Sequence, residues 1–219
     1  MEKTAVSEGK INPGNFIAFE GIDGSGKSTQ ISMLMDRLKK EGIYCYNTKE
    51  PTDSPIGSLI HQILTGRLKT DNRVIAGLFV ADRLDHLLNE TDGILSKIKE
   101  GTTVITDRYY FSSYAYHSVD MPMEWVIRAN EQSSAILRPT VTIFIDVTPE
   151  IAIERIVKNR FHQELFEKRS RLEKVRENYL KAFDLLKNEE KYVIIDGNQP
   201  PEKVAEAVWD TVREFCLRL

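Results

Sequence analysis

The sequence predicts an α/β protein in which a parallel sheet of five strands is covered by helices on both faces. Three observations predict it. Five short apolar runs alternate with longer segments whose apolar residues recur at helical spacing. A glycine-rich segment joins the first run to the first helical segment. A length of 219 residues with 41% hydrophobic residues suits one domain with a sizeable core.

The five expected strands are short runs of mostly β-branched and other apolar residues. They cover residues 16–20, 43–48, 102–106, 141–145 and 192–195. Because most of these runs are apolar throughout instead of alternating, they are typical of parallel strands that are buried on both faces.

The intervening segments are expected to be helices. Residues 28–41 place Ile31, Leu34 and Leu38 on one helical face, and Gly42 ends the segment. Right-handed crossovers between parallel strands place all strand carboxyl ends at one edge of the sheet, where ligands gather. Further helices are expected at residues 56–64, 73–99 with a break at Gly93, 123–137, 150–158, 172–187 and 202–217.

Composition and charge exclude several classes of protein. The chain has 30 Lys and Arg against 33 Asp and Glu, so it lacks the basic surplus of a dedicated nucleic-acid binder. No apolar run approaches the roughly 18 residues of a spanning helix, so we expect no membrane partner and a cytoplasmic location. Cys45 and Cys216 are too few for a disulfide scaffold, and the spacing of the histidines indicates no zinc site.

The chain is expected to divide into two unequal parts. Residues 1–15 are polar, lack the apolar centre of a signal peptide, and are expected to form a flexible N-terminal extension. Residues 16–219 are expected to form the domain. Within it, a charge-dense stretch at residues 158–171 is expected to be a short lid.

The strongest functional signal is the segment GIDGSGKS at residues 21–28, which fits the pattern G-x-x-x-x-G-K-[ST]. It follows an apolar strand and precedes an amphipathic helix, as a phosphate-binding loop requires. Glycines let backbone N–H groups converge on phosphate oxygens, and the helix presents its positive end to them. Lys27 is expected to reach the β- and γ-phosphates of ATP, and Ser28 to ligate Mg²⁺. The expected ATP-binding residues are Gly21, Ile22, Asp23, Gly24, Ser25, Gly26, Lys27, Ser28 and Thr29.

A second anchor is the pair Asp107 and Arg108, which follows the third expected strand. If that strand lies beside the first, Asp107 can hold Mg²⁺ or its waters. Arg108 can then bridge the donor and acceptor phosphates with its planar guanidinium. Lys27, Asp107 and Arg108 are therefore expected to be catalytic. Asp146 also ends a strand, but it has no adjacent arginine or aromatic cluster, and we interpret it as structural.

Three classes of nucleotide-binding protein compete at this point. A regulatory GTPase needs an N-K-x-D motif, which the sequence lacks, and a motor-type ATPase usually has a longer chain. A small kinase needs a second substrate pocket and a mobile basic lid within about 200 residues, and the remaining features fit it. The alternatives are a kinase for another nucleoside or nucleotide and, less favoured, a non-catalytic nucleotide-binding switch.

Several short motifs accompany the phosphate loop in a characteristic order. They are Asp23 in the loop, EPT at residues 50–52, LFVADR at 78–83, DRY at 107–109 and SSYAY at 112–116. In this order they resemble the thymidylate kinases, from about residue 16 to the last helix. The resemblance implies a P-loop nucleoside monophosphate kinase, which transfers the γ-phosphate of ATP to dTMP with Mg²⁺ and gives dTDP for dTTP synthesis. It also implies a homodimer.

The resemblance implies a role for individual side chains. Asp23 would lie beside the 3′-hydroxyl of the acceptor. Phe79 would stack on thymine, and Arg83 would bond the thymine carbonyl. Tyr116 would close over the sugar and disfavour a 2′-hydroxyl. The expected dTMP pocket is completed by Glu50, Arg108, Ser112 and Ser113.

The sequence departs from the common pattern of this family at two positions. Lys49 stands where arginine usually precedes Glu-Pro, and lysine keeps the charge but loses the bidentate fork. His117 stands where glutamine usually follows the Ala-Tyr pair, and we assign it no role. The phosphate loop carries no arginine, so the catalytic charge is expected to come from the lid region between Arg155 and Arg171. The candidates are Arg160, Arg169 and Arg171, with Arg160 preferred.

Overall fold

A computed structural model describes residues 13–157 and 163–217 of the protein. In these residues five strands form one sheet with the order β2-β3-β1-β4-β5, and every neighbouring pair is parallel. The strands are β1 (Phe16–Glu20), β2 (Cys45–Lys49), β3 (Thr103–Asp107), β4 (Val141–Asp146) and β5 (Tyr192–Asp196). The prediction of an α/β protein with a five-stranded parallel sheet is therefore confirmed.

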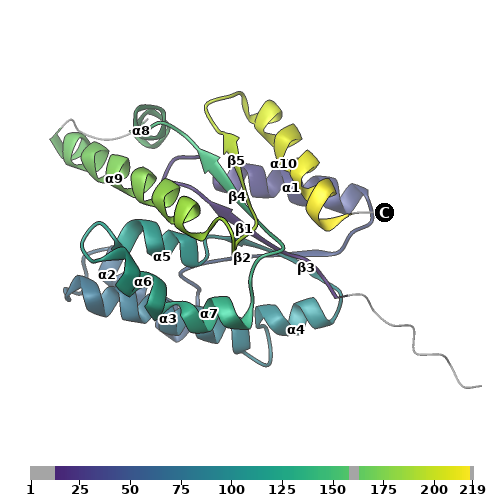
Figure 1. Ribbon diagram of the computed structural model, residues 1–219, viewed down its shortest axis with the longest axis horizontal. Helices are drawn as coiled ribbons and strands as arrows, with labels where there is room; N and C mark the ends of the chain where they lie inside the picture. Colours follow the sequence, from purple (N-terminus) through teal and green to yellow (C-terminus); the bar gives the residue numbers. More distant parts are fainter. Residues whose placement is uncertain (1–12, 158–162, 218–219) are drawn as a thin grey trace, which may run out of the picture.

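Helices cover both faces of this sheet (Figure 1). Helices α1 and α10 lie on one face, and α3, α5 and α9 lie on the other. No helix in the described parts of the chain is both long enough and apolar enough to cross a bilayer. The helices are α1 (Lys27–Lys40), α2 (Pro55–Leu64), α3 (Asn72–Leu88), α4 (Ile94–Lys99), α5 (Tyr110–His117), α6 (Met123–Ala129), α7 (Glu131–Ile136), α8 (Pro149–Val157), α9 (Gln163–Leu186) and α10 (Pro201–Cys216).

The central strand β1 divides the core into two hydrophobic layers. Successive side chains of a strand point to opposite faces. Ile17 and Phe19 thus pack with α1 and α10, whereas Phe16 and Ala18 pack with α5 and α9. All five residues of β1 are buried, which explains why its sequence is apolar up to its last residue.

The helices differ from expectation mainly between β3 and β4. Helix α5 was not expected, because its sequence YFSSYAYH is rich in residues of modest helix propensity and shows no apolar stripe. Residues 110–115 are all buried, so the buried residues run on without the helical spacing that marks a helix with one exposed face. The single helix expected at residues 123–137 is two helices that meet at Asn130, whose side chain donates to the Val126 carbonyl. Helix α9 begins at Gln163, nine residues before the expected start at residue 172.

The N-terminal boundary also differs from expectation. The Gly14 amide donates to the Ile98 carbonyl at 2.8 Å, and the Asn15 side chain donates to the Cys216 carbonyl at 3.2 Å. The folded part therefore begins before residue 16. Residues 1–12 of the expected extension lie outside the described residues.

The strand order brings the two predicted phosphate-binding segments together. β1 lies between β3 and β4, and Phe19 is in register with Asp107. The phosphate loop leaves the carboxyl end of β1, and Arg108 follows the carboxyl end of β3. The role expected for Asp107 required β3 to lie beside β1, and the two strands are neighbours.

Candidate active site

The phosphate loop connects β1 to α1 by a path that only glycine follows easily. Gly24 has φ 82° and Gly26 has φ 96°, both in the left-handed region. A Cβ atom at Gly24 would lie 2.4 Å from the Ala152 carbonyl oxygen of α8. The loop therefore has room for no side chain at residue 24.

Lys27 occupies the floor of this loop. Its ammonium group donates to the Gly21 carbonyl at 3.0 Å and to the Ile22 carbonyl at 3.3 Å, and it lies 3.9 Å from Asp107 Oδ1. Burial lowers the pKa of Lys27 to about 8, and the nearby positive charge of Arg108 adds to this effect. An anion in the loop would favour the charged form again.

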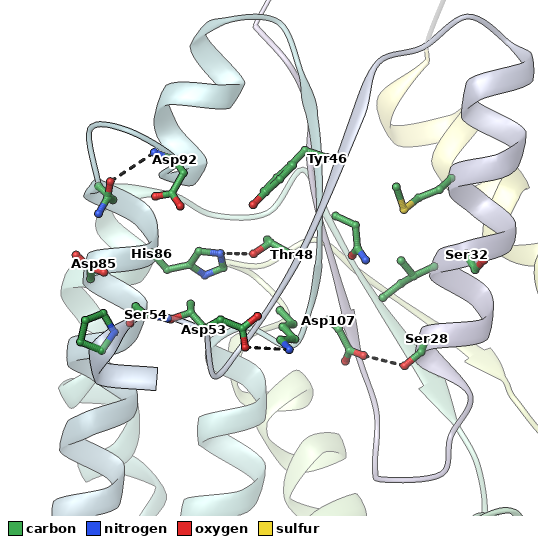
Figure 2. Close-up of a pocket in the computed structure, with 17 residues that line it drawn as sticks. Ser28, Ser32, Tyr46, Thr48, Asp53, Ser54, Asp85, His86, Asp92 and Asp107 are labelled. Atoms are coloured by element: carbon green, nitrogen blue, oxygen red, sulfur yellow. Dashed lines mark hydrogen bonds and ion pairs between the residues drawn. The ribbon is translucent and has the colours of Figure 1, made fainter. Parts of the chain in front are cut away.

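The side chains of Ser28 and Asp107 meet at the rim of the loop. Ser28 Oγ donates to Asp107 Oδ2 at 3.3 Å (Figure 2). Asp107 Oδ1 is buried and has no hydrogen-bond partner among the described residues. Mg²⁺ sites that also bind a substrate phosphate use one or two protein oxygens, and phosphate oxygens and water complete the coordination shell. The hydroxyl and the carboxylate fit that requirement.

Arg108 contacts both the phosphate loop and helix α5. Its backbone adopts φ 77°, and its amide donates to the Phe19 carbonyl at 2.9 Å. The guanidinium reaches the phosphate loop and helix α5 at the same time. Its acceptors are Asp23 Oδ1 (2.6 Å), Tyr116 OH (3.1 Å), Ser112 Oγ (3.0 Å), Tyr179 OH (3.4 Å) and the Gly21 carbonyl (3.4 Å).

Tyr116 and Phe79 are the two aromatic residues that were expected from the sequence to hold the acceptor. Tyr116 OH accepts from the Asp23 amide at 3.1 Å and from Arg108, and burial raises its pKa to about 12, so it stays protonated. The half-buried ring of Phe79 packs against the imidazole of His117. Burial lowers the pKa of His117 to about 4, so this imidazole is neutral at pH 7.

Arg83 is almost fully buried, with 1% of its surface exposed, and all five of its N–H donors have partners. Two donors go to the carboxylate of Glu50, at 2.6 and 2.9 Å, and one goes to the Tyr109 carbonyl. The other two go to the Ser113 hydroxyl and the Asn130 side-chain oxygen. A bond from Arg83 to a base carbonyl would thus replace one of these partners, and the predicted contact stays a prediction.

A cleft of about 570 Å³ joins the phosphate loop to the Glu50-Pro51 segment. One of its wall residues is Arg155 of α8, which begins the segment expected to supply the catalytic charge but was not among the three candidate arginines. The Arg155 guanidinium donates to the Ser25 carbonyl of the loop at 3.2 Å and to the Gly197 carbonyl at 3.0 Å. The signal available from sequence was only its place on a helix after β4, which does not specify the direction of the side chain.

A larger cleft of about 850 Å³ lies between α1 and α3, over the edge strand β2 (Figure 2). It shares Ser28, Lys49 and Asp107 with the first cleft. On its far side, His86 of α3 is 2.7 Å from the Thr48 hydroxyl of β2. Lys49 forms an exposed ion pair with Asp53 at 3.2 Å, so its role toward a phosphate stays a prediction.

The structure does not bring the described lid candidates to the phosphate loop. Arg169 pairs with Glu150 and, at 3.0 Å, with Glu173. Arg171 lies 3.4 Å from Asp120. Arg160, the preferred candidate, lies outside the described residues. Asp146 forms a two-bond ion pair with Arg176, at 2.6 and 2.8 Å, as its structural interpretation predicted.

Comparison with known proteins decides the family. The family model for thymidylate kinases matches residues 19–208. The chain belongs to the thymidylate kinase family. It is 40% identical over 199 residues to a probable thymidylate kinase from Pyrobaculum aerophilum, covering 90% of this chain and 96% of the relative. It is 36% identical over 210 residues to a thymidylate kinase from Ligilactobacillus salivarius, covering 92% and 99%.

A third relative has similar coverage. The chain is 35% identical over 208 residues to a thymidylate kinase from Symbiobacterium thermophilum, with 93% of this chain and 94% of the relative covered. The resemblance to thymidylate kinases that was predicted from short motifs is therefore confirmed over most of the chain.

Proposed function

We propose that this chain transfers the γ-phosphate of ATP to dTMP and gives ADP and dTDP, a step of dTTP synthesis. Thymidylate kinases use ATP and dTMP, and the chain is a member of that family over residues 19–208. The observation that carries the proposal is the position of Arg108. Its guanidinium bonds both Asp23 of the phosphate loop and Tyr116 of the predicted acceptor side. This bridging position supports a role for Arg108 between the donor and the acceptor phosphate.

In this mechanism the protein positions and neutralises phosphates. Phosphoryl transfer has a loose transition state, so catalysis depends on alignment and on stabilising charge. Lys27 neutralises the β- and γ-phosphates, and Arg108 holds the acceptor phosphate in line with the γ-phosphate. An oxygen of the dTMP phosphate forms the new bond as the bond to ADP breaks. That oxygen is already anionic, so no general base is needed.

Mg²⁺ held by Ser28 and Asp107 would supply further positive charge to the ATP phosphates when bound. The buried Asp107 Oδ1, which lacks a hydrogen-bond partner among the described residues, supports this assignment. Two protein ligands leave the remaining positions for phosphate oxygens and water, as Mg²⁺ prefers.

The acceptor pocket is proposed to lie between α3 and α5. Phe79 supplies the stacking face for thymine, and Tyr116 closes the pocket where a 2′-hydroxyl would lie. Ser112 and Ser113 line its α5 side. Glu50 supports this pocket indirectly, because its buried carboxylate holds the guanidinium of Arg83. Arg155, beside the loop, is proposed to contribute positive charge on the ATP side, together with a lid at residues 158–171.

A homodimer is supported by an apolar stripe along α3. Val74, Gly77, Ala81 and Leu88 recur at intervals of three, four and seven residues, and all four are exposed. Leu59 and Leu64 of the neighbouring α2 are also exposed. A second copy of this chain would cover these residues. We propose that the enzyme acts in the cytoplasm on free nucleotides, with no nucleic-acid or membrane partner.

An acceptor panel tests the proposed function. The purified chain is given ATP and Mg²⁺ with dTMP, dUMP, UMP, CMP, AMP or thymidine, and ADP release is measured. We expect the highest kcat/KM with dTMP. Preference for thymidine or for a ribonucleotide would identify another nucleoside or nucleotide kinase. ATP binding without turnover on any acceptor would identify a nucleotide-binding switch.

A further inference from the structure

Glu20, the last residue of β1, is a fully buried carboxylate that the mechanism above does not use. Its Oε1 accepts from the amides of Tyr109 at 2.9 Å and Ser112 at 3.2 Å. Its Oε2 accepts from the Ser112 hydroxyl at 2.5 Å and the Tyr179 hydroxyl at 2.9 Å. Four donors from the β3–α5 connection, α5 and α9 therefore converge on one side chain.

The two hydroxyls that bond Glu20 also bond Arg108. Arg108 Nη1 donates to Ser112 Oγ at 3.0 Å and to Tyr179 OH at 3.4 Å. When both hydroxyl hydrogens point to the carboxylate, the oxygen lone pairs face the guanidinium. Ser112 and Tyr179 thus connect a buried anion to the cation at the phosphate-transfer position.

Glu20 also acts on the main chain at Arg108. That residue has φ 77°, an uncommon conformation for a residue with a side chain. The amide that follows it, that of Tyr109, is held by Glu20 Oε1. A carboxylate oxygen thus holds the peptide group between Arg108 and Tyr109, which is bonded to the Cα atom that carries the Arg108 side chain.

We propose that Glu20 is a positioning residue, which orients the Arg108 guanidinium toward the acceptor phosphate through Ser112, Tyr179 and the Tyr109 amide. This inference rests on the proposed function, because it assigns Arg108 to the acceptor phosphate. It predicts that loss of the Glu20 charge weakens recognition of the phosphate group and leaves recognition of the nucleoside unchanged.

Glu20→Gln is the sharpest variant, because it keeps the shape of the side chain. With its NH₂ group at the Oε1 position, the amide would face two backbone donors. With that group at the Oε2 position, it would donate to the hydroxyl oxygens that Arg108 uses. The first orientation breaks the contact with the Tyr109 amide and the second breaks the contact through the hydroxyls, and both remove the negative charge. Burial raises the pKa of Glu20, and hydrogen bonds from Ser112, Tyr109 and Tyr179 with the Arg108 charge oppose that rise.

Calorimetric titration of the full chain with dTMP and with thymidine separates positioning from support of the fold. We expect Glu20→Gln to raise the Kd for dTMP roughly tenfold, as for one lost charge-assisted contact, and to leave the Kd for thymidine within about twofold. Glu190→Gln is the matched control. Glu190 is also buried and accepts from a tyrosine of α5, Tyr110, at 2.7 Å, but it has no contact with Arg108.

A double-mutant cycle with Arg108→Ala tests the route. If Glu20 acts through Arg108, Glu20→Gln changes the dTMP Kd little in the Arg108→Ala background. Equal weakening of dTMP and thymidine, or full additivity in the cycle, would overturn the positioning role while leaving the proposed function intact. A wild-type chain that binds neither ligand would overturn the proposed function and this inference with it.

Discussion

The imidazole of His117 packs against the phenyl ring of Phe79, with ring centroids 5.2 Å apart and ring planes at 59°. The contact joins the last turn of α5 to the middle of α3. Because the imidazole is neutral at pH 7, this wall of the predicted pocket presents two aromatic faces without added charge. A flat, uncharged base fits such a wall.

Replacing Phe79 with alanine should weaken dTMP binding more than ATP binding, because Phe79 lies away from the phosphate loop. We expect the KM for dTMP to rise about tenfold or more, which corresponds to the loss of one stacked aromatic contact of about 1–3 kcal/mol. The KM for ATP should stay within about twofold. Phe79→Leu keeps apolar volume, so its KM for dTMP should lie between those of the wild type and Phe79→Ala. Equal effects on both substrates would remove Phe79 from the acceptor site.

Replacing Lys27 with alanine should lower kcat by about 10²-fold or more, since one charge that stabilises the transferring phosphate is lost. Coupled measurement of ADP release reports this directly. Lys203, an exposed lysine of α10, provides the control, and Lys203→Ala should leave turnover unchanged. Wild-type turnover in the Lys27 variant would rule out the mechanism.

The lowered pKa of Lys27 predicts the pH dependence of ATP binding. Below pH about 8 the free enzyme carries the charged ammonium, so affinity should change little. As pH rises through about 8, the ammonium loses its proton and affinity should fall. Because ATP favours the charged form, binding near this pH should take up protons, which calorimetry in buffers of different ionisation enthalpy detects. Affinity that rises above pH 8 would contradict the assignment.

Replacing Glu50 with glutamine should destabilise the fold by about 3–5 kcal/mol, because it leaves the Arg83 guanidinium buried without its carboxylate partner. Urea unfolding measures this change in the free energy of unfolding. Glu206 forms an exposed ion pair with Arg37, and Glu206→Gln should change the same quantity by less than about 1 kcal/mol. A similar loss of unfolding free energy in both variants would contradict the prediction that the buried Glu50–Arg83 pair matters more to stability than an exposed pair.

The sequence predicted the sheet well, because the strands are short apolar runs with no competing interpretation. It did not predict α5, where the residues that line the site also fill the core. The phosphate loop was predicted because its backbone conformation requires glycine at fixed positions, and a sequence pattern can specify those positions. The positive φ angles at Gly21, Gly24 and Gly26 are that requirement.

The remaining parts of the site depend on contacts between distant segments. Arg83 was expected to face a base, yet its five donors are taken by Glu50, Ser113, Asn130 and Tyr109, and no local pattern encodes such a set. Arg155 was passed over because helical position alone does not reveal which loop it faces.

Helix α3 is proposed to serve the dimer contact with one side and the acceptor pocket with the other. Val74, Gly77, Ala81 and Leu88 form its outward stripe, while Phe79 and Arg83 project from the opposite side and contact α5. If subunits join along that stripe, each monomer braces the base-recognition wall of its neighbour. Diluting the protein below the dissociation constant of the dimer would then reduce its discrimination among acceptors at concentrations where its affinity for ATP is still unchanged.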